Sequence, residues 1–297
     1  MAEELNVDLT HGIKKLEIFS KNFLKTKFFG QYKSTLKGKG LEFSNFRDYT
    51  YQDDSSRIDW KTTARMNKPM IKEYIDERNL EVFFLIDVSS SMVFGSTKKL
   101  KNEYVAELIA ALSYGISNVG DSVGYALFSD TITHLTPPSL NKNIFYTLTK
   151  TLITPENYGG SYNFEFALDK VTKLLKENTI LIIVSDFIGL KGNWKEYLKK
   201  GAYKLDIIGI MIRDPRDNEI PEDSDMIILA DPYTDQQIIL DPTPITRAKY
   251  KTYTEKQELD VENTFTKSRA SFLKLTTDKP FLPYLIAFFK KRQKWSR

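Results

Sequence analysis

The sequence predicts an α/β protein in which helices flank a central, mostly parallel β-sheet. Short continuous apolar runs at residues 82–86 and 179–184 are typical of strands that are buried on both faces. Apolar residues recur at helical spacing over residues 100–119 and 164–175. Strands and helices therefore alternate along the chain, and this alternation favours parallel strands joined by helical crossovers.

The composition supports a folded chain and excludes several kinds of site. Of the 297 residues, 41% are hydrophobic and 28% are charged, which is enough to build a core and unlike a disordered chain. The absence of cysteine excludes disulfides, thiolate zinc sites and a cysteine nucleophile. Only two histidines are present, so a histidine-rich metal site is excluded as well. Polar chemistry must therefore rest on carboxylates, hydroxyls, lysine and arginine.

The sequence carries no signal for secretion or membrane insertion. Its longest near-apolar run, residues 281–289, is interrupted by Pro283 and is too short to span a bilayer. The first ten residues are acidic and polar, unlike a secretory signal. We therefore expect a cytoplasmic protein, with a position at the membrane surface as the alternative.

The chain divides into three segments. Residues 1–78 are expected to form a small α+β module that contains a basic amphipathic helix at residues 13–28. Residues 79–245 hold the alternating strands and helices. Residues 246–297 are expected to form helices that pack on this core, the first of them extending to about residue 274. Further strands are expected at residues 123–128, 131–135, 205–212, 226–229 and 238–240.

Two of the predicted strands end in an aspartate, Asp87 and Asp186. In open parallel sheets, ligands bind beyond the carboxyl ends of the strands, at the point where the strand order reverses. Asp87 is followed by Ser89 and Ser91, and alternate residues of an extended chain point the same way. Between the two aspartates, a Gly-Gly-Ser turn presents the hydroxyl of Ser161. These oxygen donors suit a hard octahedral ion such as Mg²⁺ or Mn²⁺.

Each of these features also has a simpler interpretation. A serine-rich turn after a strand often only caps the next helix, and a strand-end aspartate is common. The order of the features favours a shared metal site, because two aspartates, two serines in phase and a Gly-Gly-Ser turn occur together. Hydroxyl ligands add no charge, so we expect the ion to keep one position open for a carboxylate from outside.

The same residues resemble the metal-ion-dependent adhesion site of von Willebrand factor A domains. Asp87, Ser89 and Ser91 match its Asp-x-Ser-x-Ser motif after the first strand. Asp186 matches the aspartate that follows the fourth strand, and Ser161 stands where that site usually has a threonine. The resemblance implies a von Willebrand factor A-like fold and a metal-dependent, non-catalytic role in protein–protein interaction.

A second resemblance covers roughly residues 30–292. Several segments look like the signature of domain-of-unknown-function family 58, in which they accompany a von Willebrand factor A-like domain. The most specific of them is Arg57-Ile58-Asp59-Trp60. This resemblance implies a MoxR-type AAA+ ATPase as the partner, in chaperone-like assembly or maturation of other proteins. The segments that carry the resemblance are Gly38–Phe43, Arg47–Tyr49, Asp53–Lys61, Ala64-Arg65, Glu73-Tyr74, Ser91-Met92 and Thr277–Phe281.

The Arg57, Asp59 and Trp60 side chains are candidates for a partner-binding site. Arginine, aspartate and tryptophan close together also commonly form a structural ion pair with an aromatic anchor. The sequence leaves both interpretations open.

Two other functions stand as alternatives. A phosphotransferase of the haloacid dehalogenase type also starts from a strand-end aspartate, but it needs an acid two residues later, where this chain has Ser89. No phosphate-binding loop or nucleophile elbow is present either, so we expect no enzymatic activity. The excess of lysine and arginine over residues 12–47 would suit a basic scaffold on nucleic acid or a membrane surface. No DNA-reading motif accompanies it, which disfavours nucleic acid as the partner.

Overall fold

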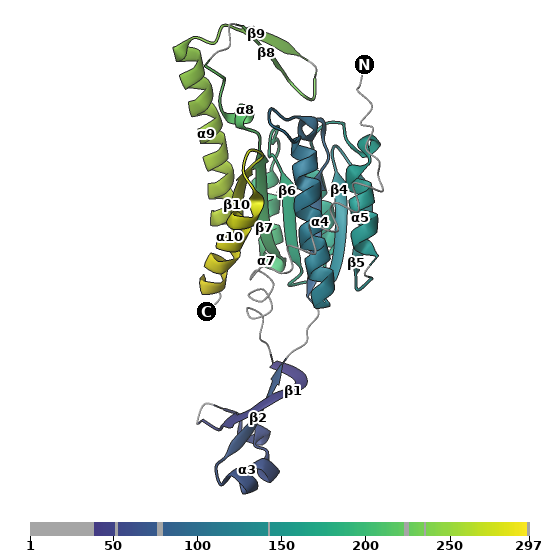
Figure 1. The fold of residues 1–297 in the computed structure, drawn as a ribbon, viewed down its shortest axis with the longest axis vertical. Coiled ribbons are helices and arrows are strands. Elements are labelled where there is room, and N and C mark those ends of the chain that lie inside the picture. The colour runs from purple at the N-terminus through teal and green to yellow at the C-terminus, as the bar shows by residue number, and fades with distance from the viewer. Residues whose placement is uncertain are drawn as a thin grey trace.

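The computed structural model in Figure 1 describes residues 39–50, 53–75, 80–141, 143–222, 226–234 and 236–295. The basic helix expected at residues 13–28 lies outside the described residues. None of the helices in the described part of the chain combines the length and the hydrophobicity that a transmembrane segment needs.

A six-stranded sheet forms the centre of the molecule, in the order β10-β7-β6-β3-β4-β5. Every neighbouring pair is parallel except β4 and β5, which pair antiparallel at one edge. The chain proceeds outward from β3 to β4 and β5, then returns to the other side of β3 with β6, so the strand order reverses between β3 and β6. The strands are β3 (Glu81–Asp87), β4 (Ser122–Phe128), β5 (Ile132–Ser139), β6 (Ile180–Ser185), β7 (Asp206–Arg213) and β10 (Ser271–Thr276).

Helices cover both faces of the sheet, as the apolar runs of its strands require (Figure 1). Alternate residues of β3 point to opposite faces: Phe84 and Ile86 enter one core cluster, and Phe83 and Leu85 enter the other. The first cluster is covered by α4 (Lys101–Val119), α5 (Ile144–Ile153) and α10 (Phe281–Trp295). The second is covered by α6 (Phe164–Leu174), α7 (Trp194–Lys204) and α9 (Pro244–Lys267). This arrangement is the α/β fold that the sequence predicts.

The C-terminal segment, residues 246–297, contains a strand in addition to its helices. The polar helix was expected to extend to about residue 274, but α9 ends at Lys267, and β10 then pairs in parallel with β7. Arg269 adopts a positive φ of 63° between the two elements, so the chain turns there without a glycine. Pairing with β10 also protects the backbone edge of β7, which would otherwise be exposed.

The N-terminal module is a two-stranded antiparallel sheet with a short helix. β1 (Lys39–Asp48) pairs with β2 (Met70–Ile75), and α3 (Trp60–Met66) lies between them in the sequence. Asp59 begins the helix, because its carboxylate accepts a hydrogen bond from the Thr62 amide at 2.8 Å. The left-handed Asn67, with φ of 56°, ends the helix.

A small hairpin follows the short helix α8 (Pro215–Asn218). Its strands are β8 (Ile227–Ala230) and β9 (Gln237–Leu240), and they pair antiparallel. Figure 1 shows the hairpin at the end of the molecule where α8 and the start of α9 lie, which is the end where β7 finishes. The loop between β8 and β9 therefore lies at the same end of the molecule as the carboxyl ends of the central parallel strands.

Candidate metal centre

The first motif lies where β3 ends. Asp87 is fully buried, and its Oδ1 accepts a hydrogen bond from the Ser89 amide at 2.8 Å. Its Oδ2 accepts a hydrogen bond from the Ser185 hydroxyl at 2.6 Å. The hydroxyls of Ser89 and Ser91 lie 3.3 Å apart. The structure therefore brings together the three side chains whose spacing predicts convergence, although Ser91 belongs to a short 3₁₀ turn and not to an extended strand.

The second aspartate lies where β6 ends, next to β3 in the sheet. Asp186 is also fully buried; its Oδ1 accepts a hydrogen bond from the Ile188 amide at 2.9 Å. Burial and, after it, the negative charge of Asp186 raise the pKa of Asp87 to about 7, against the lowering effect of the hydrogen bonds from Ser185 and Ser89. The two carboxylates are thus close enough to repel each other, as expected at the point where the strand order reverses.

A lysine that the sequence motifs do not predict occupies the same region. The Nζ of Lys101 lies 2.7 Å from Asp186 Oδ2 and 3.1 Å from Asp217 Oδ2, and the lysine side chain is only 1% exposed. Burial lowers the pKa of Lys101, but the charges of the two carboxylates outweigh it and the pKa stands above its usual value. One of the two predicted carboxylate ligands therefore already has a cation as its partner.

A signal for Lys101 does exist in the sequence. It is the first residue of α4, where the partial positive charge of the helix terminus disfavours a cation. A lysine at the first position of this amphipathic helix is compatible with a nearby negative charge. Its partners could not be named, because Asp186 and Asp217 lie 85 and 116 positions away along the chain.

Ser161 lies at the rim of the site. Its side chain is exposed, and the described residues give it no hydrogen bond to the other four predicted ligands. Its loop is nonetheless attached to the first motif: the Gly159 amide donates to the Val88 carbonyl at 2.8 Å, and the Ser90 amide donates to the Gly160 carbonyl at 3.1 Å. The loop that carries Ser161 therefore approaches the first motif.

Tyr233, in the loop between β8 and β9, covers the two serines. Its hydroxyl lies 3.0 Å from Ser91 Oγ and 3.0 Å from the Ile188 carbonyl, and its single proton can serve only one of them at a time. Gly189 permits this approach, because a Cβ at that position would lie 2.7 Å from the tyrosine ring. With the tyrosine in place, Ser91 is 3% exposed and Ser89 is fully buried. No pattern in the loop sequence distinguishes this tyrosine from a surface residue.

The donor set fits a magnesium-type ion. Asp87, Ser89 and Ser91 present hard oxygens within one turn of chain, and Asp186 adds a second carboxylate from the next strand. The described residues contain no group of three or more acidic or histidine side chains placed to hold a metal. An ion here would therefore depend on the serine hydroxyls, and binding would be weak without a further ligand.

The structure separates the roles of the family-signature residues. Asp59 begins α3 and also pairs with Lys72, whose hydrogen bond is the main cause that lowers the Asp59 pKa to about 2. Trp60 is 72% exposed and does not serve as a buried anchor. The Arg57 side chain lies outside the described residues. A partner-binding role for Arg57, Asp59 and Trp60 stays a prediction.

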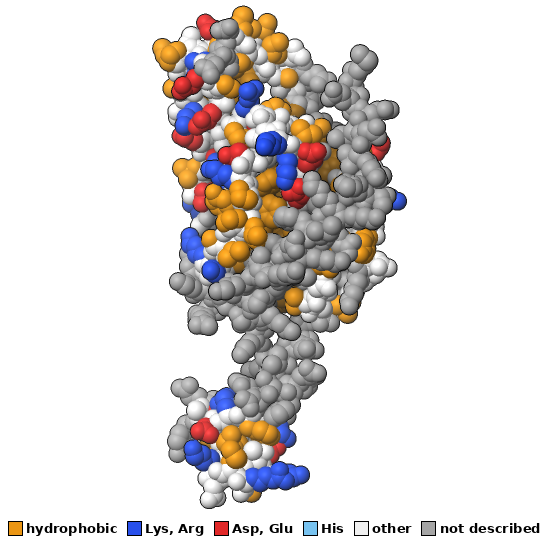
Figure 2. Space-filling model, viewed as in Figure 1, with side chains coloured by type: hydrophobic (Ala, Val, Ile, Leu, Met, Phe, Trp, Pro, Cys, Tyr) orange, Lys and Arg blue, Asp and Glu red, His pale blue; other side chains and the backbone are white. Residues whose placement is uncertain are grey.

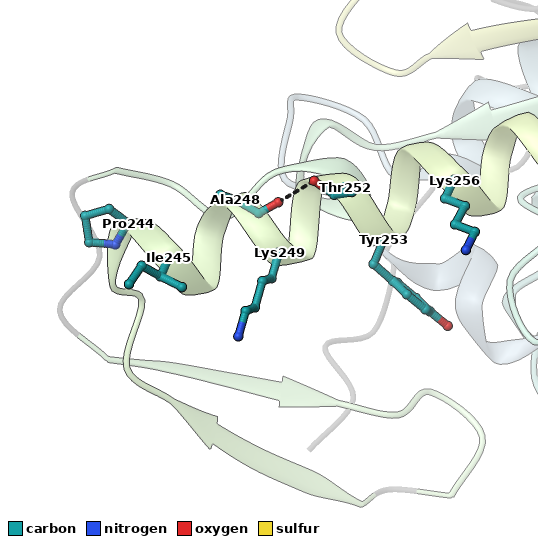
Figure 3. Close-up of a pocket in the computed structure, with 7 residues that line it drawn as sticks. All are labelled: Pro244, Ile245, Ala248, Lys249, Thr252, Tyr253 and Lys256. Carbon is teal, nitrogen blue, oxygen red and sulfur yellow. Dashed lines mark hydrogen bonds between the residues drawn. The ribbon is translucent and has the colours of Figure 1, made fainter.

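An apolar groove lies on α9, on the side facing the β8–β9 hairpin (Figure 3). Hydrophobic side chains gather at this end of the molecule in Figure 2, and the hairpin exposes Ile228, Ile238 and Ile239. The groove shares no lining residue with the strand-end site, so the two are separate features of the surface. Its lining residues are Pro244, Ile245, Ala248, Lys249, Thr252, Tyr253 and Lys256.

The strand order, the antiparallel edge strand and the convergent Asp-x-Ser-x-Ser turn define an α/β protein of the von Willebrand factor A-like class. A family model described as "Protein of unknown function DUF58" matches residues 45–260. Because this match covers more than half of the chain, the protein belongs to that family.

Related proteins and structures carry little functional description. The uncharacterized protein Rv1480 of Mycobacterium tuberculosis is 26% identical over 289 residues, which cover 96% of this chain and 90% of the relative. The solved structure of BatB, a conserved hypothetical protein from Bacteroides thetaiotaomicron, has a TM-score of 0.48 and 15% identity, covering 72% of this chain and 99% of that chain. The SpRpn10 VWA domain has a TM-score of 0.38 and 11% identity, covering 70% of this chain and 94% of that chain.

Proposed function

We propose that the protein is a non-catalytic, metal-dependent protein-interaction domain. The observation that carries the proposal is the convergence of Asp87, Ser89 and Ser91 at the reversal of strand order, with Asp186 on the adjacent strand. Asp87, Ser89, Ser91 and Asp186 would hold one Mg²⁺ or Mn²⁺ ion, and Ser161 would contribute from the rim. The ion supplies an electrophilic centre to which a carboxylate of another protein can bind.

The chemistry of the ligands determines the kind of partner. Serine hydroxyls bind a cation without neutralising it, so an ion held by two carboxylates and two hydroxyls favours an anionic ligand from outside. A surface glutamate or aspartate of a partner protein meets this need. We propose a MoxR-type AAA+ ATPase as this partner, in assembly or maturation of other proteins in the cytoplasm. The chain's membership of the DUF58 family strengthens the second resemblance, and that resemblance is the basis for choosing this partner.

The alternatives lack support at the site. A phosphotransferase that used Asp87 as its nucleophile would need an acid at position 89 to protonate the leaving oxygen, and the serine there cannot serve. The basic segment that suggests a nucleic-acid or membrane scaffold lies mostly outside the described residues.

The test is a titration of Mn²⁺ into the wild-type protein and an Asp87→Ala variant, followed by partner pull-down with and without a chelator. The variant is expected to keep its fold, because β3 is held by apolar residues on both faces, and to lose both metal and partner. Asp169→Ala is the matched control, since Asp169 forms only an exposed pair with Lys173 on α6. Equal Mn²⁺ binding by wild type and Asp87→Ala, or pull-down indifferent to the chelator, would reject the proposal.

A further inference from the structure

Lys101 occupies a position that is unfavourable for a cation unless a strong negative charge balances it. It is buried, and it stands at the first position of α4, next to the positive end of the helix dipole. Two carboxylates compensate for both penalties, one from the end of β6 and one from α8. The lysine is therefore held in place by the same aspartate that the metal site requires.

The hydrogen bonds of Asp186 determine which group a metal ion at this carboxylate would compete with. One of its carboxylate oxygens, Oδ1, accepts the Ile188 amide, and the other, Oδ2, accepts the Lys101 ammonium. No oxygen of this carboxylate is without a donor. Each oxygen keeps a second lone pair, but a divalent ion bound to Asp186 would lie close to the ammonium and be repelled by it. The amide is fixed by the loop, whereas the lysine side chain has rotatable bonds. The ammonium is the group that can move.

The structure also provides a place for the displaced ammonium. Lys101 Nζ already lies 3.1 Å and 3.4 Å from the two carboxylate oxygens of Asp217. The Phe94 ring centroid lies 5.6 Å from the same nitrogen, within the range of a cation–π contact. A small rotation toward Asp217 would free Asp186 and leave the charge paired.

We infer that Lys101 is an internal counter-ion that competes with the divalent metal for Asp186, and that Asp217 receives the ammonium when the metal binds. The inference rests on the metal site of the proposed function and adds what controls its occupancy. Without metal, the lysine pairs with Asp186 and Asp217 and serves as the internal cation of the cluster. With metal, the lysine is retained by Asp217, and the open position of the ion becomes available to the partner.

A double variant tests this exchange without changing the charge of the cluster. Lys101→Met/Asp217→Asn removes one positive and one negative charge, so a gain in metal affinity would report lost competition and not a change in net charge. Its Mn²⁺ affinity, measured by calorimetry, is expected to exceed that of wild type by about tenfold or more. Mn²⁺ is also expected to raise its melting temperature by more than it raises that of wild type, because the ion now neutralises Asp186.

The single variant Asp217→Asn is the second measurement, and it retains the lysine should the double variant fail to fold. With Asp217 neutral, the ammonium has only Asp186 as a charged partner, so Mn²⁺ is expected to bind several-fold more weakly than to wild type. A double variant that binds Mn²⁺ no more tightly than wild type, or Asp217→Asn that binds at least as tightly, would overturn the counter-ion role and leave the metal site standing. Absence of Mn²⁺ binding in wild type and all variants would overturn the proposed site itself.

Discussion

The two strand-end aspartates share a sequence pattern and a depth of burial, yet their charges are balanced in different ways. Asp87 accepts hydrogen bonds only from neutral donors, the Ser89 amide and the Ser185 hydroxyl. Asp186 accepts one from a backbone amide and one from the Lys101 ammonium. An apolar strand that ends in aspartate thus predicts where a carboxylate will lie, but not which group will balance its charge.

The difference lies in the donor that comes from a distant part of the chain. Each aspartate accepts one hydrogen bond from the backbone amide two residues later, that of Ser89 for Asp87 and that of Ile188 for Asp186. The second donor to Asp87 is the neutral hydroxyl of Ser185 at the end of β6, whereas the second donor to Asp186 is the ammonium of Lys101 at the start of α4. The fold brings both second donors, and only the one at Asp186 carries a charge.

The largest expected effect tests the Asp186 side. Lys101→Met leaves Asp186 and Asp217 buried without the ammonium that pairs with both, and removing one member of a buried ion pair costs about 3–5 kcal/mol in the free energy of unfolding. Urea denaturation in the presence of a chelator measures this loss. Added Mn²⁺ is expected to restore part of it.

The matched control for this loss is Lys173→Met. Lys173 pairs with Asp169 on the surface of α6, and exposed pairs of this kind contribute little to stability. If the two lysine variants lose the same small amount, the ion pair does not stabilise the Asp186 side and the comparison between the aspartates fails.

The next largest expected effect is a gain in the free energy of unfolding, and it concerns Asp87. Asp87→Asn removes a buried charge that has no cationic partner among the residues that the structure describes and that is repelled by Asp186. The asparagine carbonyl can still accept the Ser89 amide, so the turn after β3 is preserved. We expect the metal-free protein to gain roughly 1–3 kcal/mol of stability at neutral pH.

The pH dependence of this gain provides its own check. The pKa of Asp87 rises from 3.8 in the unfolded chain to about 7 in the folded state, so the wild-type protein loses stability as the pH rises from about 4 to about 7. Asparagine does not ionise, so the difference in free energy of unfolding between the two proteins should grow between about pH 4 and about pH 7 and stay constant above that range. A difference that has already reached its full size at pH 4 would show that ionisation of Asp87 is not its cause.

The fold was largely predictable because its signals are local. The apolar runs that became β3 and β6 are typical of strands buried on both faces, and their alternation with helices favours a parallel sheet. β10 was not predicted, because no glycine or proline marks the end of α9 and the turn relies on Arg269 in a left-handed conformation. The pairing of β10 with β7 depends on contacts between distant parts of the chain.

The site was predictable in part for the same reason. Asp87, Ser89 and Ser91 lie within one turn of chain, so their spacing alone predicts that they converge. Lys101 and Tyr233 could not be placed, because their partners are brought to them by the packing of α4 and by the β8–β9 hairpin. The convergence of the proposed ligands can thus be predicted from a motif, whereas the residues that pair with them or cover them cannot.

The smallest expected effect concerns Tyr233, which touches both sides of the comparison. Its hydroxyl reaches Ser91 of the first motif and the Ile188 carbonyl next to Asp186. Tyr233→Phe keeps the ring on Gly189 and removes only the hydroxyl, so the loss of stability should be about 1 kcal/mol, the usual contribution of one hydrogen bond. With Ser91 Oγ released as a ligand, Mn²⁺ should bind a few-fold more tightly.

Tyr104→Phe is the matched control, since the Tyr104 hydroxyl donates to the Lys279 carbonyl at 2.9 Å. This variant should lose similar stability with no change in Mn²⁺ affinity. An unchanged Mn²⁺ affinity in Tyr233→Phe would mean that the tyrosine hydroxyl does not compete for Ser91, and that the barrier to metal lies on the Asp186 side alone.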